Sequence, residues 1–208
     1  MKAERVIAYI DGFNLYFGLK EKGWACYYWL NLKQLCQNFT NDPRHPRNLI
    51  LVKYFTSRIT DPPDKRKRQS TYLEALNTIA GIQPYYGIYQ PTAITCEQCG
   101  YVNYKPEEKM TDVQLSTELV SDAYKNKYDT AIIISGDRDL VPAIETIRSN
   151  PPNKRVIVIF PPMRTNKDLM GVANAYLHIT EKELEKSLLP PAITKTGGYV
   201  LNCPSEWH

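Results

Sequence analysis

The chain has 208 residues, a formal net charge of +4 and a pI near 8.7. Its length suits one α/β domain, its 43% hydrophobic content supports a core, and no apolar run approaches the ~18 residues of a membrane span. The charge is compatible with a polyanionic partner but is far from a histone-like excess. Five cysteines, an odd number, argue for a reducing compartment and against a disulfide framework. We therefore expect a soluble cytoplasmic protein, and the strand that begins at Arg5 leaves no room for a signal peptide.

The first half of the chain alternates apolar strands with amphipathic helices. A strand over residues 5–10 stops at Asp11, and the spacing of apolar residues predicts a helix over 31–39. The other expected elements here are a short helix over 15–20, a strand over 49–58, a helix over 65–79 and an edge-like strand over 81–89.

The second half continues the alternation after an insertion over residues 90–106, which we expect to be irregular. An unbroken β-branched run over 130–134 predicts a strand buried on both faces, and Gly136 then allows a tight turn. The remaining expected elements are helices over 109–124, 140–148, 168–176 and 181–188, strands over 155–160 and 178–180, and an extended tail over 190–208 that packs on a neighbour.

Alternation of this kind predicts a three-layer α/β/α fold with a mostly parallel sheet. We expect one domain over residues 1–180, with the insertion inside it, and a C-terminal helix and tail over 181–208.

Carboxylates stand at the ends of three of these elements. Asp11 follows the first strand, Asp112 lies in the first turn of a helix, and Asp137 and Asp139 follow the buried strand. The carboxyl edge of a parallel sheet is where ligands bind, and clustered acids need a cation between them. Hard oxygen ligands suit Mg²⁺ or Mn²⁺. Singly, each acid is also explained as a helix cap or a turn former.

Three segments carry a resemblance to a known family: Ile10-Asp-Gly-Phe-Asn14, Glu108-Lys-Met-Thr-Asp112-Val and Ile134-Ser-Gly-Asp137-Arg-Asp139-Leu. In this order they resemble the NYN domain, a branch of the PIN-like nuclease superfamily, over roughly residues 5–180. The resemblance implies a metal-dependent endoribonuclease in which Asp11, Asp112 and Asp137 hold Mg²⁺ or Mn²⁺. It also implies that Asn14 orients water or substrate and that Asp139 is a further ligand or supports the ligands. Many relatives have serine where this chain has Arg138, a change that would alter contact with the substrate.

Other reaction classes find less support. The three histidines are His45, His178 and His208, and none stands in a strand-end motif, so a histidine-based ribonuclease is disfavoured. There is no nucleophile elbow and no Walker loop. Two alternatives stay open: a non-catalytic RNA-binding or regulatory protein on the same fold, and an aspartyl phosphatase, although that would require Asp-x-Asp after the first strand.

Basic and aromatic residues are the candidates for RNA binding. We expect phosphate contacts from side chains at strand ends and at a helix start, namely Arg58, Lys65, Arg66, Lys67, Arg68, Lys109, Arg138 and Arg164. The 65–68 run is explained equally well as a solvated helix face. Tyr27, Tyr28, Tyr85, Tyr86, Tyr89 and Tyr101 have the chemistry to stack on bases, but packing in the core or between subunits is their more ordinary use.

The insertion carries Cys96-Glu-Gln-Cys99-Gly, which is half of a zinc knuckle. A structural zinc site needs four ligands, and no second pair follows at the usual spacing. Cys96 and Cys99 are therefore candidate zinc ligands, or two free thiols in a loop. Beyond RNA, a homo-oligomer and a regulatory protein are the partners left open.

Overall fold

The computed structural model of the chain describes residues 3–41, 46–149 and 154–207, without the side chains of 89–92 and 104–108. His45, His208 and the side chain of Tyr89 thus lie outside the described residues. The strands are β1 (Glu4–Asp11), β2 (Arg47–Ser57), β3 (Ile82–Thr95), β4 (Val102–Lys109), β5 (Thr130–Ile134), β6 (Arg155–Phe160), β7 (Ala175–His178), β8 (Ala192–Thr194) and β9 (Val200–Asn202). The helices are α1 (Gly12–Glu21), α2 (Leu32–Thr40), α3 (Pro63–Leu76), α4 (Thr111–Tyr124), α5 (Val141–Ser149), α6 (Lys167–Val172) and α7 (Glu181–Glu185), with 3₁₀ turns η1 (Ala25–Tyr27), η2 (Arg138–Leu140) and η3 (Ser205–Trp207).

A mostly parallel sheet forms the centre of the molecule. In the described ranges its order is β4-β3-β2-β1-β5-β6-β7, and only the β3–β4 pair is antiparallel. The first strand, β1, is therefore central, with β2 on one side and β5 on the other. This arrangement confirms the predicted sheet.

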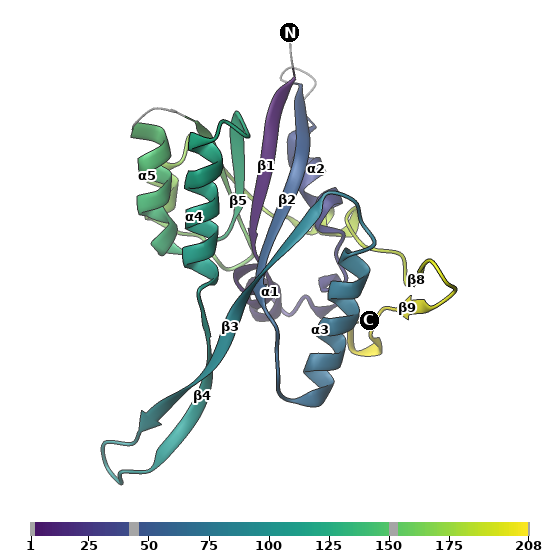
Figure 1. Cartoon of the computed structure of the whole chain (residues 1–208), viewed down its shortest axis with the longest axis vertical. Coiled ribbons are helices and arrows are strands. Elements are labelled where there is room, and N and C mark those ends of the chain that lie inside the picture. The colour runs from purple at the N-terminus through teal and green to yellow at the C-terminus, as the bar shows by residue number, and fades with distance from the viewer. Residues whose placement is uncertain (1–2, 42–45, 150–153, 208) are drawn as a thin grey trace.

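Helices cover both faces of the sheet, because alternate residues of β1 point into two separate cores. Val6, Ala8 and Ile10 join the core under α1, α2, α3 and α7, whereas Ile7 and Tyr9 join the core under α4 and α5. Figure 1 shows α4 and α5 on one side of the sheet and α2 and α3 on the other. The three-layer α/β/α fold is thus confirmed.

The expectation of an irregular insertion over 90–106 is wrong. Residues 82–87 pair with β2, and β3 then continues to Thr95 and pairs with β4 in an antiparallel hairpin. The hairpin projects from the body of the molecule (Figure 1). Local sequence did not indicate it, because each of its strands is completed only by hydrogen bonds to the other.

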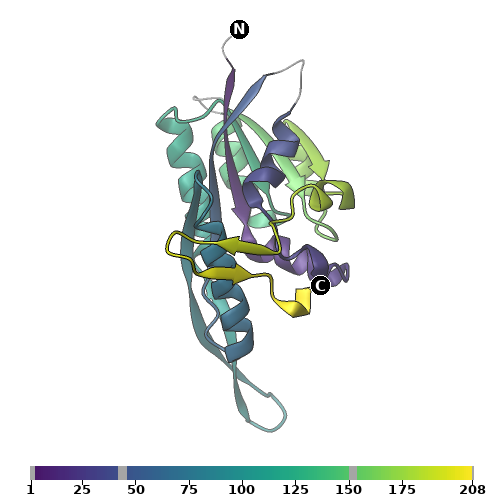
Figure 2. The same cartoon turned by 90° about the vertical axis from the view of Figure 1, so that its right-hand side faces the viewer.

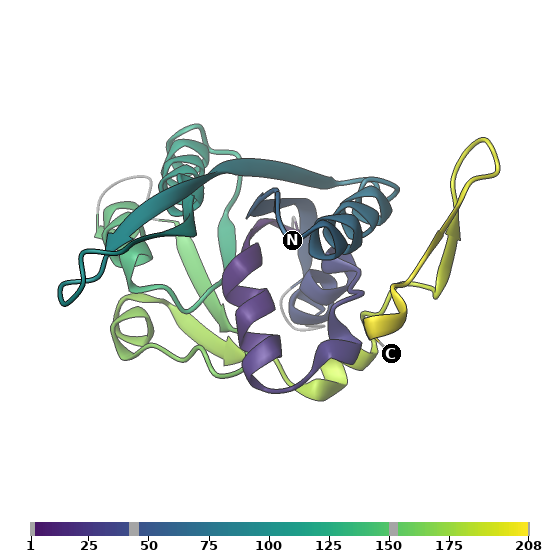
Figure 3. The ribbon, with the colours of Figure 1, turned by 90° about the horizontal axis from the view of Figure 1, so that it is seen from below.

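The C-terminal segment also differs from the expectation. The predicted helix over 168–176 ends at Val172, because residues 175–178 pair in parallel with β6 as β7. The predicted extended tail forms the β8–β9 hairpin, which crosses α3 in Figure 2. Trp207 then packs on Tyr28, Trp29 and Tyr72, so the tail covers the chain's own core. Seen from below, β8–β9 and the β3–β4 hairpin extend on opposite sides of the body (Figure 3).

Candidate metal centre

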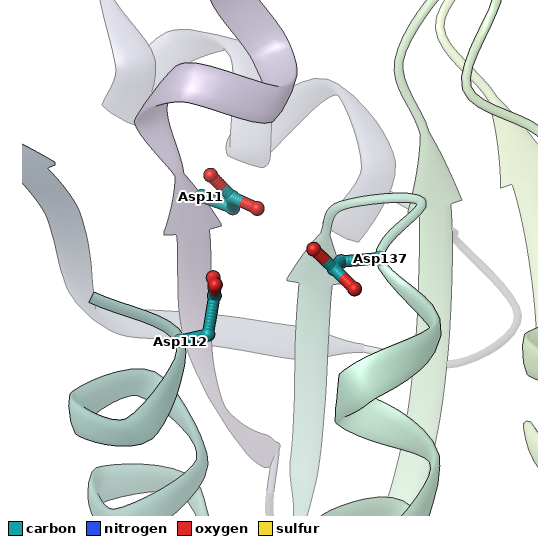
Figure 4. A group of neighbouring side chains, drawn as sticks. All are labelled: Asp11, Asp112 and Asp137. Carbon is teal, nitrogen blue, oxygen red and sulfur yellow. The ribbon is translucent and has the colours of Figure 1, made fainter. Parts of the chain in front are cut away.

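Three aspartates meet at the carboxyl edge of the sheet. Asp11 ends β1, and Asp137 follows the neighbouring β5 after Ser135 and Gly136. Asp112 enters from the first turn of α4, which begins after Met110 in the left-handed conformation at φ 80°. Figure 4 shows the three carboxylates facing one another from these elements.

The spacing of these carboxylates suits a single cation. Carboxylate oxygens of Asp11, Asp112 and Asp137 all lie within 4.8 Å of one another. Ligands at about 2.1 Å from Mg²⁺ would be roughly 3 to 4 Å apart, so a small inward rotation of the side chains completes the approach. Three hard oxygen donors in this geometry fit Mg²⁺ or Mn²⁺.

The electrostatics of the cluster favour a bound cation. Asp11 is 7% exposed. Burial raises the pKa of Asp112, and repulsion from Asp137 and Asp139 raises it further. A positive ion among the acids would reverse that repulsion.

A hydroxyl and an amide hold the acids in place. Ser135 Oγ donates to Asp11 Oδ2 at 2.9 Å and accepts from the Asp137 backbone N–H at 3.0 Å. Asn14 Oδ1 accepts from the Gly136 backbone N–H at 2.9 Å. Ser135 is fully buried, and the sequence did not lead us to expect its role. The signal that could have indicated it is its position as a polar residue directly after a buried strand. The predicted role of Asn14 toward water or substrate stays a prediction; the structure shows that its oxygen ties α1 to the loop after β5.

Asp139 lies beside the cluster. Its backbone N–H donates to Asp137 Oδ1 at 2.9 Å, and its side chain is exposed in η2. The predicted helix start near Leu140 is thus shared between η2 and α5, with Asp137 as the cap of η2.

Glycine allows the backbone to approach closely at this edge. A Cβ at Gly136 would lie 1.7 Å from the carbonyl oxygen of Arg164, and one at Gly12 would lie 2.7 Å from the carbonyl oxygen of Phe55. The loop after β6 therefore packs directly on the loop that carries Asp137.

The predicted RNA-binding cations differ in how they are paired. Arg164 pairs with Glu21, Arg138 pairs with Asp168 at 2.8 Å, and Arg68 pairs with Glu206 at 2.6 Å. Arg58 is exposed and lies over the Tyr86 ring at 4.6 Å. Lys65, Arg66 and Lys67 are exposed on α3, which begins at Pro63, earlier than expected, with Asp64 in its first turn. Lys109 ends β4, directly before the turn into α4.

The candidate tyrosines divide between the core and the surface. Tyr27 is buried and donates to Glu181, and Tyr85 donates to Glu118. Tyr101 is exposed on the β3–β4 hairpin. Tyr28 lines a cavity next to the acids.

This cavity has a volume of about 260 Å³ and lies between α1 and α3. Gly12 and Phe13, directly after Asp11, form part of its wall, and Lys65 and Arg68 lie at the α3 side. Its lining is mainly apolar and includes the aromatic residues Phe13, Tyr16, Tyr28, Tyr54, Tyr72 and Trp207. A planar ring of nucleobase size would fit there.

The two candidate zinc ligands lie in the turn between β3 and β4, at the tip of the hairpin. Cys96 and Cys99 are both exposed. Hydrogen bonds from the backbone of Cys99 and Gln98 and from the Cys99 side chain lower the pKa of the Cys96 thiol. His178 is exposed at the end of β7, so this strand lies earlier in the chain than the predicted range of 178–180.

In the part of the chain that the structure describes, no helix is long and apolar enough to cross a membrane.

Known proteins resemble this chain in sequence and in fold. The chain is similar to 6-hydroxy-3-succinoylpyridine 3-monooxygenase HspA of Pseudomonas putida, with 27% identity over 240 aligned residues that cover 98% of this chain and 75% of that protein. Its fold is similar to the crystal structure of a protein of unknown function from Vibrio parahaemolyticus, with a TM-score of 0.57 and 19% identity over 91% of this chain and 100% of the other. The family model of the NYN domain matches residues 5–181. The chain therefore belongs to the NYN domain family, a branch of the PIN-like nuclease superfamily.

Proposed function

We propose that the protein is a metal-dependent endoribonuclease. The observation that carries the proposal is the convergence of Asp11, Asp112 and Asp137 at the carboxyl edge of the sheet. Membership of the NYN domain family supports a nuclease and RNA as its substrate.

In this proposal the three aspartates hold Mg²⁺ or Mn²⁺. Such a cation would activate water for attack and neutralise the charge that grows on the scissile phosphate. The Ser135 hydroxyl orients Asp11 by donating a hydrogen bond to its carboxylate. The same oxygen accepts a hydrogen bond from the Asp137 backbone N–H and so holds the loop that carries Asp137. Asn14 holds Gly136, and Asp139 keeps the loop turned toward the cluster through its backbone N–H.

Cleavage within a strand requires RNA on both sides of the acids, and the cations are arranged for this. Arg58 follows β2 and the 65–67 run lies on α3, on one side of β1. Arg138 follows β5 and Arg164 follows β6, on the other side. Phosphates can thus be contacted upstream and downstream of the bond that is cut.

Circular and linear single-stranded RNA test the proposal together. The protein should cut both in Mn²⁺ or Mg²⁺ and neither in EDTA, since a circle can be opened only by an endonuclease. Asp11→Asn should abolish cleavage, while Glu145→Gln, at an exposed carboxylate of α5, should not change it. Metal-dependent cleavage that persists in Asp11→Asn would reject the acid cluster as the site.

The non-catalytic alternative gives a different result in the same experiment. An RNA-binding or regulatory protein would bind the labelled strand with the same affinity in EDTA and in Mg²⁺, and it would leave both RNAs intact. Binding with a strong salt dependence but without cleavage would support that alternative.

A second candidate function rests on the cavity between α1 and α3. The similar protein HspA is named as a monooxygenase of a hydroxypyridine that carries a succinoyl group. The aromatic lining suits a planar heteroaromatic ring, and Arg68 and Lys65 suit its carboxylate. Titration calorimetry with 6-hydroxy-3-succinoylpyridine should then give binding that Arg68→Gln weakens about 10-fold, the loss of roughly 1.4 kcal/mol. Absence of heat with the wild-type protein would remove this candidate.

A further inference from the structure

The β3–β4 hairpin presents two thiols at its free end. From Ile88 to Lys109 the described backbone pairs only within the hairpin, since the pairing of β3 with β2 ends at Gly87. The hairpin projects past the body of the molecule, and no other described element lies beside its tip in Figures 1 and 2. Another molecule can therefore reach the tip without contact between the two bodies.

Backbone hydrogen bonds close the turn that carries the two cysteines. Cys96 N–H donates to the Tyr101 carbonyl at 2.8 Å, and Gly100 N–H donates to the Cys96 carbonyl at 2.9 Å. Gly100 takes a φ of 70°, which reverses the chain and favours glycine. Two cysteines three residues apart in such a turn commonly supply two of the four ligands of a zinc ion.

This half-site has no completion within the described part of one chain. Structural zinc is bound by four ligands in a tetrahedron, and a Cys-x-x-Cys turn supplies two. No third histidine, cysteine or acidic side chain lies with Cys96 and Cys99 among the described residues. Apolar side chains flank the pair and are exposed, namely Ile94, Tyr101 and Val102 at 47%, 69% and 42%. Exposed apolar residues around an incomplete metal site indicate a surface that a partner covers.

We propose that two copies of the chain join tip to tip through one Zn²⁺, bound by Cys96 and Cys99 of each copy. A second copy supplies the same two thiols in the same turn, so a two-fold axis through the ion completes the tetrahedron. Each of the four sulfurs binds as a thiolate, and the protons leave to solvent. The ion does not need the acid cluster, so the proposal is independent of the nuclease reaction.

The test combines zinc content with molar mass. The reduced protein, loaded with Zn²⁺ and desalted, is compared with Cys96→Ser/Cys99→Ser by elemental analysis and light scattering. The control is Cys26→Ser, which removes another exposed thiol. The wild type and the control should hold half a zinc ion per chain more than the double variant. Zinc bound at the aspartates would be present in all three proteins, so it does not affect this difference. Their mass should be twice the 24.0 kDa of one chain, and a zinc chelator should halve it.

Three results would overturn the proposal. The first is a difference of one ion per chain at monomer mass, which would place all four ligands in one chain. The second is no difference in zinc content between reduced wild type and double variant. The third is a dimer that persists in the double variant, which would place the interface elsewhere. Circular dichroism of the double variant should match that of the wild type, because both positions are exposed at the tip and outside both cores.

Discussion

A buried charge network attaches α4, the helix that carries Asp112, to the sheet. Lys53 on β2 and Asp122 on α4 are 2% and 1% exposed. Lys53 Nζ contacts Asp122 and also Glu118, the latter at 2.5 Å. Tyr9 donates to Asp122 at 2.8 Å, and Tyr85 donates to Glu118 at 2.9 Å. We expect Lys53→Met to be among the most destabilising single changes in the chain.

The expected cost follows from what the substitution leaves behind. Methionine fills most of the volume of lysine, so the loss is electrostatic, and Asp122 stays buried with only Tyr9 and Lys127 as described partners. Removing one member of a buried ion pair costs about 3–5 kcal/mol, because the remaining charge is not compensated. A matched control is Lys127→Met. It removes another lysine from the same carboxylate, but this lysine is 50% exposed, so the cost should stay below about 1 kcal/mol.

Urea unfolding followed by circular dichroism measures both costs. A lower midpoint at constant slope in Lys53→Met would report lost stability rather than a changed unfolded state. Adding Asp122→Asn to Lys53→Met should cost less than the sum of the two single changes, since the pair is coupled. Equal costs for Lys53→Met and Lys127→Met would refute the reasoning that burial makes this ion pair important.

The same network predicts a range of pH over which it contributes. Burial alone would lower the pKa of Lys53 and raise that of Asp122, but their mutual hydrogen bonds outweigh it and shift both in the opposite direction. The depressed carboxyl pKa contributes stability above the ordinary value of 3.8, lost as the pH falls through the folded pKa. The raised lysine pKa contributes stability below the ordinary value of 10.5, lost as the pH rises. The difference in unfolding free energy between wild type and Lys53→Met should therefore be largest between these values.

Four further outcomes follow from the structure. Asp137→Asn should reduce metal-dependent RNA cleavage by more than ~100-fold, which is the upper range for losing a group that only orients a ligand. The melting temperature of the metal-free protein should stay equal or rise, because repulsion among the acids is relieved. Cleavage at the wild-type rate would contradict this prediction. Glutamine at positions 65–67 should flatten the slope of log affinity against log salt for single-stranded RNA by about 2 units, three charges at ~0.7 each, whereas an unchanged slope would mean that these side chains face solvent only. The hydrogen bond from Arg5 is the main cause that lowers the pKa of Asp129 to about 2. Asp129 therefore contributes stability above pH 3.8, and this contribution is lost as the pH falls toward 2. Urea unfolding of Asp129→Asn should show a smaller loss of stability than the wild type over that range. Gly136→Ala should impair cleavage and stability together, because its Cβ would collide with a backbone carbonyl, and normal values for both would show that the loop can move away.

Much of the fold and the three acids could be predicted from local sequence. The unbroken β-branched run before Ser135 reports burial on both faces, and β5 is indeed buried along its whole length. The spacing of Leu32, Leu35 and Cys36 correctly gave the buried face of α2. Asp11 and Asp137 could be placed together because the carboxyl ends of neighbouring parallel strands meet at one edge. These features depend on residues close in the chain or on general rules of sheet topology.

Val113 is apolar but lies outside the packed face of α4. It is 69% exposed, whereas Leu115 and Leu119 are buried. Successive helical residues are about 100° apart, so residues 113 and 115 are roughly 200° apart and cannot share a face. The face of α4 that packs was set by its contacts with the sheet.

Contacts between distant segments decided the rest. The β3–β4 hairpin exists because two strands satisfy each other's backbone groups, and neither signals this alone. Ser135 reaches Asp11, and Lys53 reaches Asp122, across 124 and 69 residues of chain. A hydrogen bond or an ion pair of this kind depends on which elements the sheet order brings together. The sequence therefore determined which chemical groups stand at the ends of its strands, and only the tertiary structure decided which groups meet, because contact across a fold is set by topology and packing.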